Sequence, residues 1–278
     1  NHHYIESYTL KNTNDIELIT GLEIDLIWVA GWQRIIPDWV ISHSKLGAVG
    51  MHGSPDGICG GRGRSPQNWA ILMGCKQFDL AVFKIMPEVD NGPIVLEQTF
   101  FYNNTDDISI SYKKASLCTG QMMGQIFENP NLLNKAMKQS GDVYYYPQRK
   151  PEDGRADWSL SQIEINSHCR ALTRPYPGLR TQHNQNEIFV WHAVPFDNVI
   201  QSAPGTIDRV FEDYSFLITC GDGRILIDDY ETINKWQPEQ GMSLQSTTLT
   251  KTMERIIKRH KEKYPNMPIS NRILNWCT

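Results

Sequence analysis

The sequence predicts an α/β protein, with a doubly wound, mostly parallel sheet followed by a small β-rich domain. Two observations indicate this class. Up to residue 140, apolar strand-like runs alternate with helical segments, which is the order expected of a parallel sheet covered by helices. From residue 187 onward, short strand-like runs follow one another closely with turns between them, a pattern typical of a small β-barrel or sandwich.

The first domain is expected to span residues 1–140. Its run at 24–30 is nearly all apolar, as a strand covered on both faces should be. The short helix at 12–22 has Asn14 or Asp15 available as its cap. We expect strands at 4–10, 24–30, 48–52, 79–85 and 94–101, and helices at 12–22, from 37 onward, through 69–73 and at 107–127.

A linker is expected over residues 141–158, because its first part is rich in proline, glycine and charge. The second domain, residues 159–278, ends in a basic helix candidate at 251–263, and residues 251–278 hold seven basic and two acidic side chains. We favour a solvated surface helix there, with a phosphate-contacting tail as the alternative. Before it come a helix at 160–172 and strands at 187–194, 205–211, 215–220 and 224–228.

Composition excludes several classes of protein. The 278 residues carry a net charge of −4, so bulk electrostatics do not recruit nucleic acid. No apolar run approaches the roughly 20 residues of a membrane span. The six cysteines are irregularly spaced and form no C-x-x-C pair. We therefore expect a reduced, cytoplasmic protein without a metal site.

The stretch from Met51 to Ala70 is the centre of the first domain. It places a glycine-crowded loop between a strand and a helix, and glycine lets the backbone approach a ligand closely. His52 stands at the start of this loop, where it can exchange a proton near neutral pH, although an ordinary loop histidine is equally consistent with the position. Arg62 and Arg64 flank glycines, and they suit either a phosphate-bearing substrate or a solvated loop.

Four segments together resemble the folate-dependent formyltransferases. Residues 30–37 are similar to the family's pterin-contacting loop, residues 52–70 to its histidine motif and Asp90-Asn-Gly-Pro-Ile94 to its aspartate motif. Residues 146–178 resemble the opening of its C-terminal domain. The resemblance runs from about residue 14 to residue 230, and the order and spacing of the segments make it specific. It implies a Rossmann-like catalytic domain followed by an OB-like domain.

The resemblance also implies a reaction and a site. A formyl group would pass from N10-formyltetrahydrofolate to a primary amine through a tetrahedral oxyanion that needs stabilising. His52 and Asp90 would be the catalytic pair, on adjacent strand-end loops. The residues expected to contact the folate donor are Trp32, Arg34, Ile35, Ile36 and Leu80, and those expected to contact the acceptor are Ser54, Arg62, Arg64 and Asn68.

The chain departs from the family's pattern in two places. The family usually has an asparagine two residues before the histidine, where its amide helps to hold the formyl oxygen, and here that residue is Gly50. Asn68 is a candidate substitute, and loss of activity is the other consequence to consider. Family members also have a first strand and helix ahead of Tyr4, so we expect the sequence to be part of a longer chain.

The expected acceptor is a nucleotide-linked amino sugar. The chain is acidic overall, and its loop at residues 60–66 is more similar to that of the sugar enzymes than to the longer tRNA-contacting loop. Methionyl-tRNA formyltransferase is the alternative, because the second domain and basic tail are shared features. A third alternative is a non-catalytic relative that binds folate or a sugar nucleotide. Exposed C-terminal strands would allow a homodimer.

Overall fold

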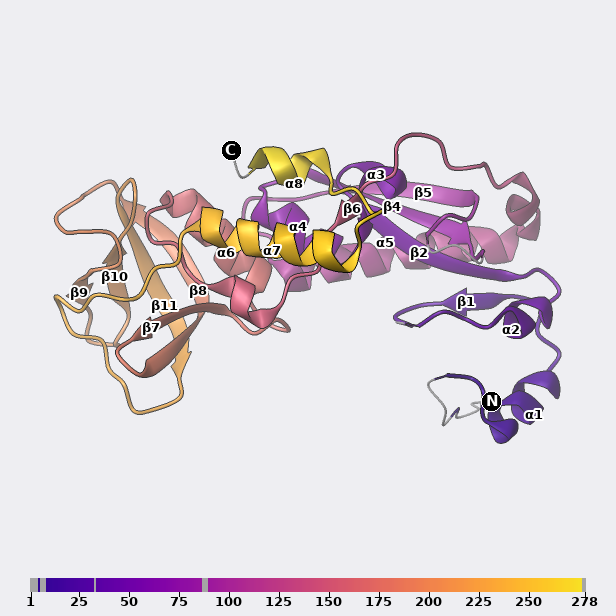
Figure 1. The fold of residues 1–278 in the computed structure, drawn as a ribbon, viewed down its shortest axis with the longest axis horizontal. Helices are drawn as coiled ribbons and strands as arrows, with labels where there is room; N and C mark the ends of the chain where they lie inside the picture. The colour runs from indigo at the N-terminus through magenta and orange to yellow at the C-terminus, as the bar shows by residue number, and fades with distance from the viewer. Residues whose placement is uncertain (1–4, 6–8, 33, 87–89, 277–278) are drawn as a thin grey trace.

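The computed structural model describes residues 5, 9–32, 34–86 and 90–276, and it places two main sheets toward opposite ends of an elongated molecule (Figure 1). The elements of the first part are α1 (Thr13–Thr20), β1 (Ile27–Val29), α2 (Asp38–Ser42), β2 (Ala48–Ser54), α3 (Gly57–Gly60), β3 (Arg62–Gly63), α4 (Pro66–Leu72), β4 (Gln77–Lys84), β5 (Ile94–Phe101) and α5 (Ile108–Glu128). Those that follow are η1 (Pro130–Lys135), β6 (Tyr145–Tyr146), η2 (Pro151–Gly154), α6 (Gln162–Leu172), β7 (Leu179–His183), β8 (Asn186–Asp197), β9 (Ile207–Val210), β10 (Phe216–Thr219), β11 (Arg224–Thr232), α7 (Leu249–Lys263) and α8 (Asn271–Trp276).

The first sheet has the strand order β1-β2-β4-β5. Its α/β class is confirmed, but the expectation of a mostly parallel sheet is wrong for the strands that the structure describes. Only β1 and β2 run parallel, whereas β4 is antiparallel to both β2 and β5. For β4 and β5 the physical reason is visible in the chain, because residues 85–93 are too few for the crossover of about a dozen residues that parallel neighbours need.

The two faces of this sheet are covered by different helices. On one face, α5 packs over a cluster that includes Val49, Leu80 and Val82. On the other face, α3 covers Ala81 and Phe83. Because side chains alternate along a strand, neighbouring residues of β4 belong to different faces, and this alternation decides which of them can reach a site.

The second sheet is antiparallel, with the order β7-β8-β11-β10-β9, and this confirms the β-rich C-terminal domain. Residues 241–247 run between its two edge strands. Their backbone bonds Ile207 of β9 on one side and Gln182 of β7 on the other. This segment closes the sheet into a barrel-like shape around a buried core. The largest buried side chains of that core include Trp158, Ile188 and Phe216.

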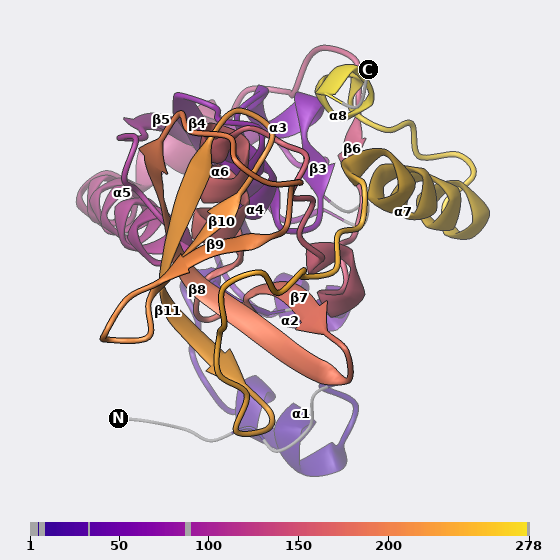
Figure 2. The same ribbon diagram turned by 90° about the vertical axis from the view of Figure 1, so that its left-hand side faces the viewer.

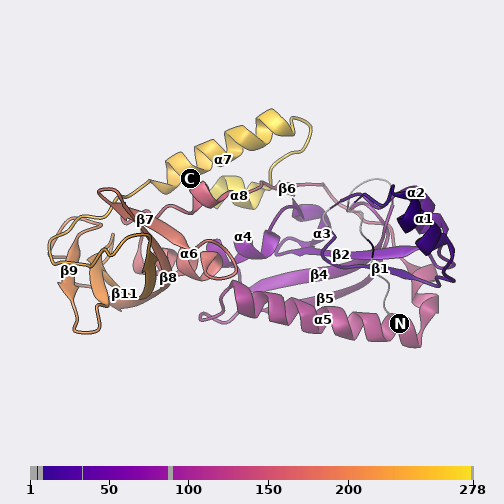
Figure 3. The same ribbon diagram turned by 90° about the horizontal axis from the view of Figure 1, so that it is seen from below.

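The segment 141–158 and α7 join the two domains. The expected linker segment buries Tyr146, Asp153 and Trp158 and is packed for much of its length. The basic helix is a surface helix, as expected, and most of its charged side chains are exposed, but one face of α7 buries Met253 and Ile256 against the rest of the chain. In Figures 2 and 3, α7 lies on the opposite side of the molecule from α5.

Two further observations concern the part of the chain that the structure describes. None of its helices combines the length and the apolar character needed to cross a bilayer. Its five cysteines, at positions 59, 75, 118, 169 and 220, are all free thiols.

Candidate active site

The glycine-rich loop is built on the α3 face of the first sheet. After β2 it forms the short helix α3 and then β3, which pairs with β6. At Gly63, φ is 107° and an added Cβ would lie 2.5 Å from the Tyr146 carbonyl oxygen, so only glycine fits there. The loop is therefore held against the segment that leads into the second domain.

His52 lies on β2, paired with Ala81, on the same face as Gly50. Its Nε2 is 3.0 Å from the carbonyl oxygen of Gly61 in the glycine-rich loop. A carbonyl oxygen can only accept, so Nε2 donates this hydrogen bond and Nδ1 carries the lone pair when the ring is neutral. The half-buried His52 side chain can thus accept a proton at Nδ1.

His52 and Asp90 were expected on neighbouring loops at the same edge of the sheet. The loop with Asp90 instead begins at the opposite edge. Because β4 is antiparallel to β2, its end at Lys84 pairs with Val49, three residues before His52. This separation corresponds to about 10 Å along a strand. Side chains rather than adjacent strand ends therefore connect Asp90 to the loop after β2. Asp90 itself has a φ of 53°, a left-handed conformation that aspartate tolerates better than most residues.

One side chain, Gln139, connects the Asp90 loop to the glycine-rich loop. Its Nε2 donates to the carbonyl oxygens of Asp90 and Gly92, each at 2.8 Å. Its Oε1 accepts from Arg62 Nη2 at 2.6 Å and from the Cys59 thiol at 3.3 Å. Sequence reasoning missed Gln139, because its partners lie far away in the chain and no local pattern marks it.

Arg62 and Arg64 differ in environment. Arg62 is only 5% exposed and its Nη2 also donates to Asn91 Oδ1 at 3.0 Å, so its contact with a substrate phosphate stays a prediction. Arg64 is exposed and remains available. The Arg62–Asn91 bond gives a second direct contact between the two loops, in addition to Gln139.

Two further residues expected to contact a ligand, Ser54 and Leu80, pack within the fold. Ser54 is fully buried, and its hydroxyl donates to the Gly57 carbonyl at 2.7 Å and accepts from the Asp56 N–H at 3.0 Å, which shapes the loop. Leu80 packs under α5, on the opposite face of the sheet from His52, so it cannot line a slot beside that residue.

Asn68 does not replace the missing asparagine. It is buried in α4, where its Nδ2 donates to the Ala171 carbonyl and its Oδ1 accepts from Arg149 Nη1 at 2.9 Å. All of these bonds connect α4 to the second domain. Gly50 itself faces Ile85 and Phe83, since an added Cβ would lie 3.2 Å from Ile85 Cδ1 and 3.6 Å from Phe83 Cζ.

The loop expected to contact the pterin follows β1. Val29 pairs with Gly50, so this loop begins beside Met51 and His52. Ile35 is 74% exposed, which is unusual for a large apolar side chain. Trp32 and Ile36 pack into a small cluster with α1 and α2, and Arg34 is exposed. Trp32 and Ile36 therefore shape the loop, while Ile35 and Arg34 are presented at its surface.

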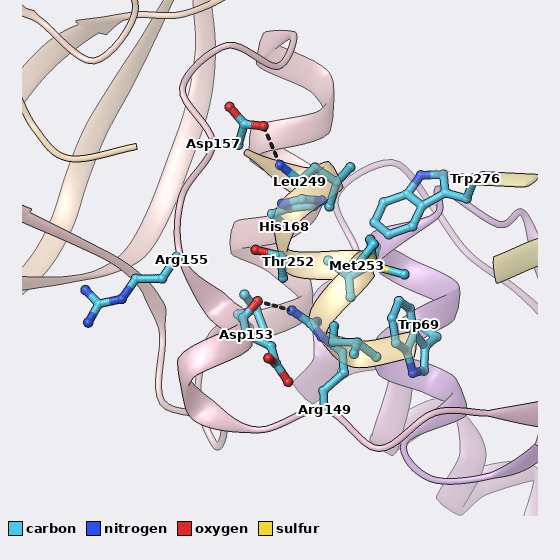
Figure 4. A pocket seen from close by; sticks show the side chains of 13 residues that line it. Trp69, Arg149, Asp153, Arg155, Asp157, His168, Leu249, Thr252, Met253 and Trp276 are labelled. Carbon is cyan, nitrogen blue, oxygen red and sulfur yellow. Dashed lines mark hydrogen bonds between the residues drawn. The ribbon is translucent and has the colours of Figure 1, made fainter. Parts of the chain in front are cut away.

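An open cleft of about 810 Å³ lies along the other side of the glycine-rich loop, between that loop and α8. Asp56 lies at its edge and holds the tail in place, because its carboxylate accepts from Tyr146 Oη at 2.8 Å and from Arg272 Nε at 2.7 Å. Cys59 and Gly60 also line the cleft. A second, small cavity lies at the domain junction, among Trp69, Arg149 and His168, and contains neither His52 nor Asp90 (Figure 4).

Comparison with known proteins gives matches over both domains. Residues 2–122 match the family model described as Formyl transferase, and residues 149–241 match the one described as Formyl transferase, C-terminal domain. Among solved structures, HypX from Aquifex aeolicus in complex with tetrahydrofolic acid aligns with a TM-score of 0.59 and 16% identity, over 91% of this chain and 51% of that one. In another HypX structure, this chain covers only 40% of the length of that protein.

Two further structures are covered over most of their length. Methionyl-tRNA formyltransferase from Clostridium thermocellum aligns with a TM-score of 0.57 and 20% identity, over 83% of this chain and 86% of that one. An N-formyltransferase from Helicobacter canadensis, in complex with folinic acid and dTDP-3-aminofucose, aligns with a TM-score of 0.57 and 16% identity, over 78% of this chain and 77% of that one. At such identities these structures show the fold, and the two family matches show that this chain belongs to the formyl transferase family.

Proposed function

We propose that this protein transfers a formyl group from N10-formyltetrahydrofolate to a primary amine, with His52 and Asp90 as its catalytic residues. The observation that carries the proposal is the joining of their two loops through Arg62, Asn91 and Gln139, although the loops follow antiparallel strands and leave opposite ends of the sheet. Two relatives of the same fold hold tetrahydrofolic acid or folinic acid.

His52 and Asp90 have different roles in the proposed reaction. The donor supplies the formyl group when it is bound. The attacking amine must be neutral and loses a proton as its bond to the formyl carbon forms, and Nδ1 of His52 can take up that proton. The carboxylate of Asp90 can stabilise the protonated ring, and the proton can then pass to the nitrogen that leaves the formyl carbon.

The folate donor fits the loop after β1. Its pterin ring is flat and carries hydrogen-bonding edges, and the loop offers backbone groups at Arg34, Ile35 and Ile36 beside the exposed Ile35 side chain. The loop begins beside His52, which would bring the donor to the catalytic residue. We propose that Trp32 keeps this loop in shape and that Leu80 has no contact with the donor.

For the acceptor we propose a nucleotide-linked amino sugar. Arg64 is exposed next to the glycine-rich loop and can bind a phosphate, while Arg62 contributes the field of its buried charge. The Helicobacter canadensis enzyme, crystallised with such a sugar, shares the fold over most of its length. Methionyl-tRNA is the second candidate acceptor, because the methionyl-tRNA formyltransferase from Clostridium thermocellum aligns with 83% of this chain.

The test is formyl transfer from N10-formyltetrahydrofolate to a panel of amino-sugar nucleotides, with product detected by mass spectrometry. We expect turnover to fall by about 10²- to 10⁴-fold in His52→Ala and in Asp90→Ala. His192→Ala, which changes an exposed histidine of the second sheet, should keep full activity.

The alternatives give different results in the same assays. Transfer to methionyl-tRNA that weakens steeply with salt would replace the sugar by the tRNA acceptor, because counterion release governs such binding. Binding of folinic acid without turnover on any amine would contradict the enzymatic proposal and leave a non-catalytic relative.

We further propose that the protein works in the cytoplasm, in line with the free thiols of its five described cysteines. A homodimer is also proposed, and sedimentation of the purified chain would test it.

A further inference from the structure

Gln139 lies in the irregular segment after η1, and its backbone position is fixed by the sheet. Two residues earlier, Met137 forms a bridge with Ile94 at the start of β5, through two N–H···O bonds of 2.8 Å each. This bridge anchors the segment to the same strand that ends the Asp90 loop. The Gln139 side chain therefore begins from a fixed point and extends between the two loops.

The four contacts of Gln139 use its amide fully. Carbonyl oxygens only accept and a guanidinium only donates, so the orientation of the amide follows from its partners. The NH₂ group faces the carbonyls of Asp90 and Gly92, and the oxygen faces Arg62 and Cys59. No other side chain of this length can both donate twice and accept from a cation, since glutamate lacks the donors and asparagine is one carbon shorter.

The two carbonyls belong to the residues on either side of Asn91, so Gln139 clasps the turn that presents the Asp90 side chain. That turn is constrained in two other ways. Asp90 has a φ of 53°, and a Cβ added to Gly92 would lie 1.6 Å from the Lys84 carbonyl oxygen. A left-handed conformation is unfavourable for aspartate and persists only where the surrounding structure stabilises it. The two hydrogen bonds from Gln139 stabilise that peptide segment directly.

We propose that Gln139 is the positioning residue of this site: it sets the place of the Asp90 carboxylate relative to the loop that holds His52. The inference rests on the proposed function for its catalytic consequence. Its structural part, the coupling of the Asp90 turn to the glycine-rich loop, stands on the hydrogen bonds alone. Gln139 need not touch either substrate to act in this way.

Two variants separate the halves of the clasp. Gln139→Glu keeps the size and the bond to Arg62 but turns an oxygen toward the carbonyls of Asp90 and Gly92, so it breaks the two hydrogen bonds that hold the turn, and it adds a negative charge beside Arg62. Gln139→Leu removes both halves. Gln125→Glu, on the exposed face of α5, makes the same chemical change away from the site and is the matched control.

The first readout does not depend on catalysis. Hydrogen exchange at residues 90–94 should accelerate by about tenfold or more in both Gln139 variants, since each lost bond contributes about 1 kcal/mol and 1.4 kcal/mol is a factor of ten. Alkylation of the Cys59 thiol should speed up in Gln139→Leu, which removes its acceptor, and stay close to wild type in Gln139→Glu. The control should match wild type in both measurements.

The second readout is kinetic. We expect kcat to fall by about 10²-fold in both Gln139→Glu and the uncharged Gln139→Leu, the size of effect that a 1 Å misplacement produces, with KM for the folate donor within about threefold of wild type. Faster exchange with wild-type kcat would overturn the positioning role, and unchanged exchange in both variants would overturn the coupling. If wild type binds folinic acid but shows no turnover, the proposed function fails while the exchange data still decide the coupling.

Discussion

The His52 site and the junction between the two domains both hold arginine side chains in hydrogen-bonded clusters, but they balance the charge in different ways. At the site, the Nη2 of Arg62 donates to the neutral amide oxygens of Asn91 and Gln139, and among the residues that the structure describes it forms no ion pair with a carboxylate. At the junction, Arg255 and Arg259 both pair with the carboxylate of Asp153, whose side chain is fully buried.

This difference separates a structural charge cluster from one that can act on a ligand. An ion pair cancels most of its own field, so the junction arginines contribute to packing and orientation. The amide oxygens that accept from Nη2 of Arg62 do not cancel its charge, so its positive field persists in a region of low dielectric. Such a field would stabilise an oxyanion that develops nearby, as the proposed reaction requires.

The two regions also differ in how closed they are. The junction packs Arg149 over Trp69 at 5.3 Å, and Trp276 meets the same indole edge-on at 6.2 Å (Figure 4). Burial lowers the pKa of Arg149 to about 10, although the neighbouring Asp153 opposes this effect. The site, in contrast, leaves His52 half-buried and Arg64 exposed. We therefore expect substitutions at the junction to change stability most and those at the site to change activity most.

The largest effect on stability is expected for Asp153→Ala. Its buried carboxylate accepts from Arg255, Arg259 and the Lys150 N–H, so its removal takes several charge-assisted bonds from two partly exposed guanidiniums and the cap from the first turn of η2. The loss of such bonds costs about 3 kcal/mol in the free energy of unfolding. Urea unfolding measures it, and Glu152→Ala next to it, about half exposed, should change stability by less than about 0.5 kcal/mol. Equal effects would mean that the junction is no more closed than the surface.

How far the sequence could predict this contrast depends on the range of the interactions. The glycine loop and Asp90-Asn-Gly-Pro-Ile94 are local motifs, so His52 and Asp90 could be named from them. Gln139 could not, because its partners lie between 47 and 80 residues away. Strand direction was mispredicted because alternating strands and helices do not encode it, although the short connection 85–93 was a signal.

The junction shows the same limit. The acidic partner of α7 is Asp153, over 100 residues before it, and composition alone made this helix look like a solvated basic tail. A signal was present in the apolar spacing of Met253, Ile256 and Ile257, which predicts one buried face of a helix. Net charge described the residues that α7 exposes and not those that it buries.

An intermediate effect is expected from pH at the junction, through His168. Burial lowers its pKa to about 3, with the nearby Arg149 acting in the same direction. In the unfolded chain the pKa is about 6.5. Above pH 6.5 both states are neutral, and as the pH falls toward 3 only the unfolded state binds the proton, so stability falls with pH.

Between pH 6.5 and pH 5 this linkage amounts to about 2 kcal/mol in the free energy of unfolding. His168→Leu cannot bind a proton in either state, so its stability should fall by that much less over the same interval, whatever its value at neutral pH. Urea unfolding at several pH values gives both slopes. Parallel slopes for the two proteins would show that His168 is hydrated when folded, and the junction would then be open like the site.

The smallest effect on stability is expected at the site, for Gly50. A Cβ there meets the end of the Ile85 side chain at 3.2 Å, and that side chain can move by a few tenths of an ångström. Gly50→Ala should therefore change the free energy of unfolding by less than about 1 kcal/mol. Crowding against Ile85 destabilises the folded state, whereas the smaller chain entropy destabilises the unfolded state, so the two effects oppose each other. A loss above about 2 kcal/mol would mean that the site is packed as tightly as the junction.

The same tolerance makes Gly50→Asn a test of the chemistry. The asparagine side chain would lie on the face of His52, where its amide adds a donor for the formyl oxygen. We expect kcat for Gly50→Asn to exceed that of Gly50→Ala by about tenfold, since removal of one such donor costs about 10²- to 10³-fold in a fully preorganised site. A kcat no higher than that of Gly50→Ala would show that the Arg62 field already stabilises the oxyanion and that the site works without the amide.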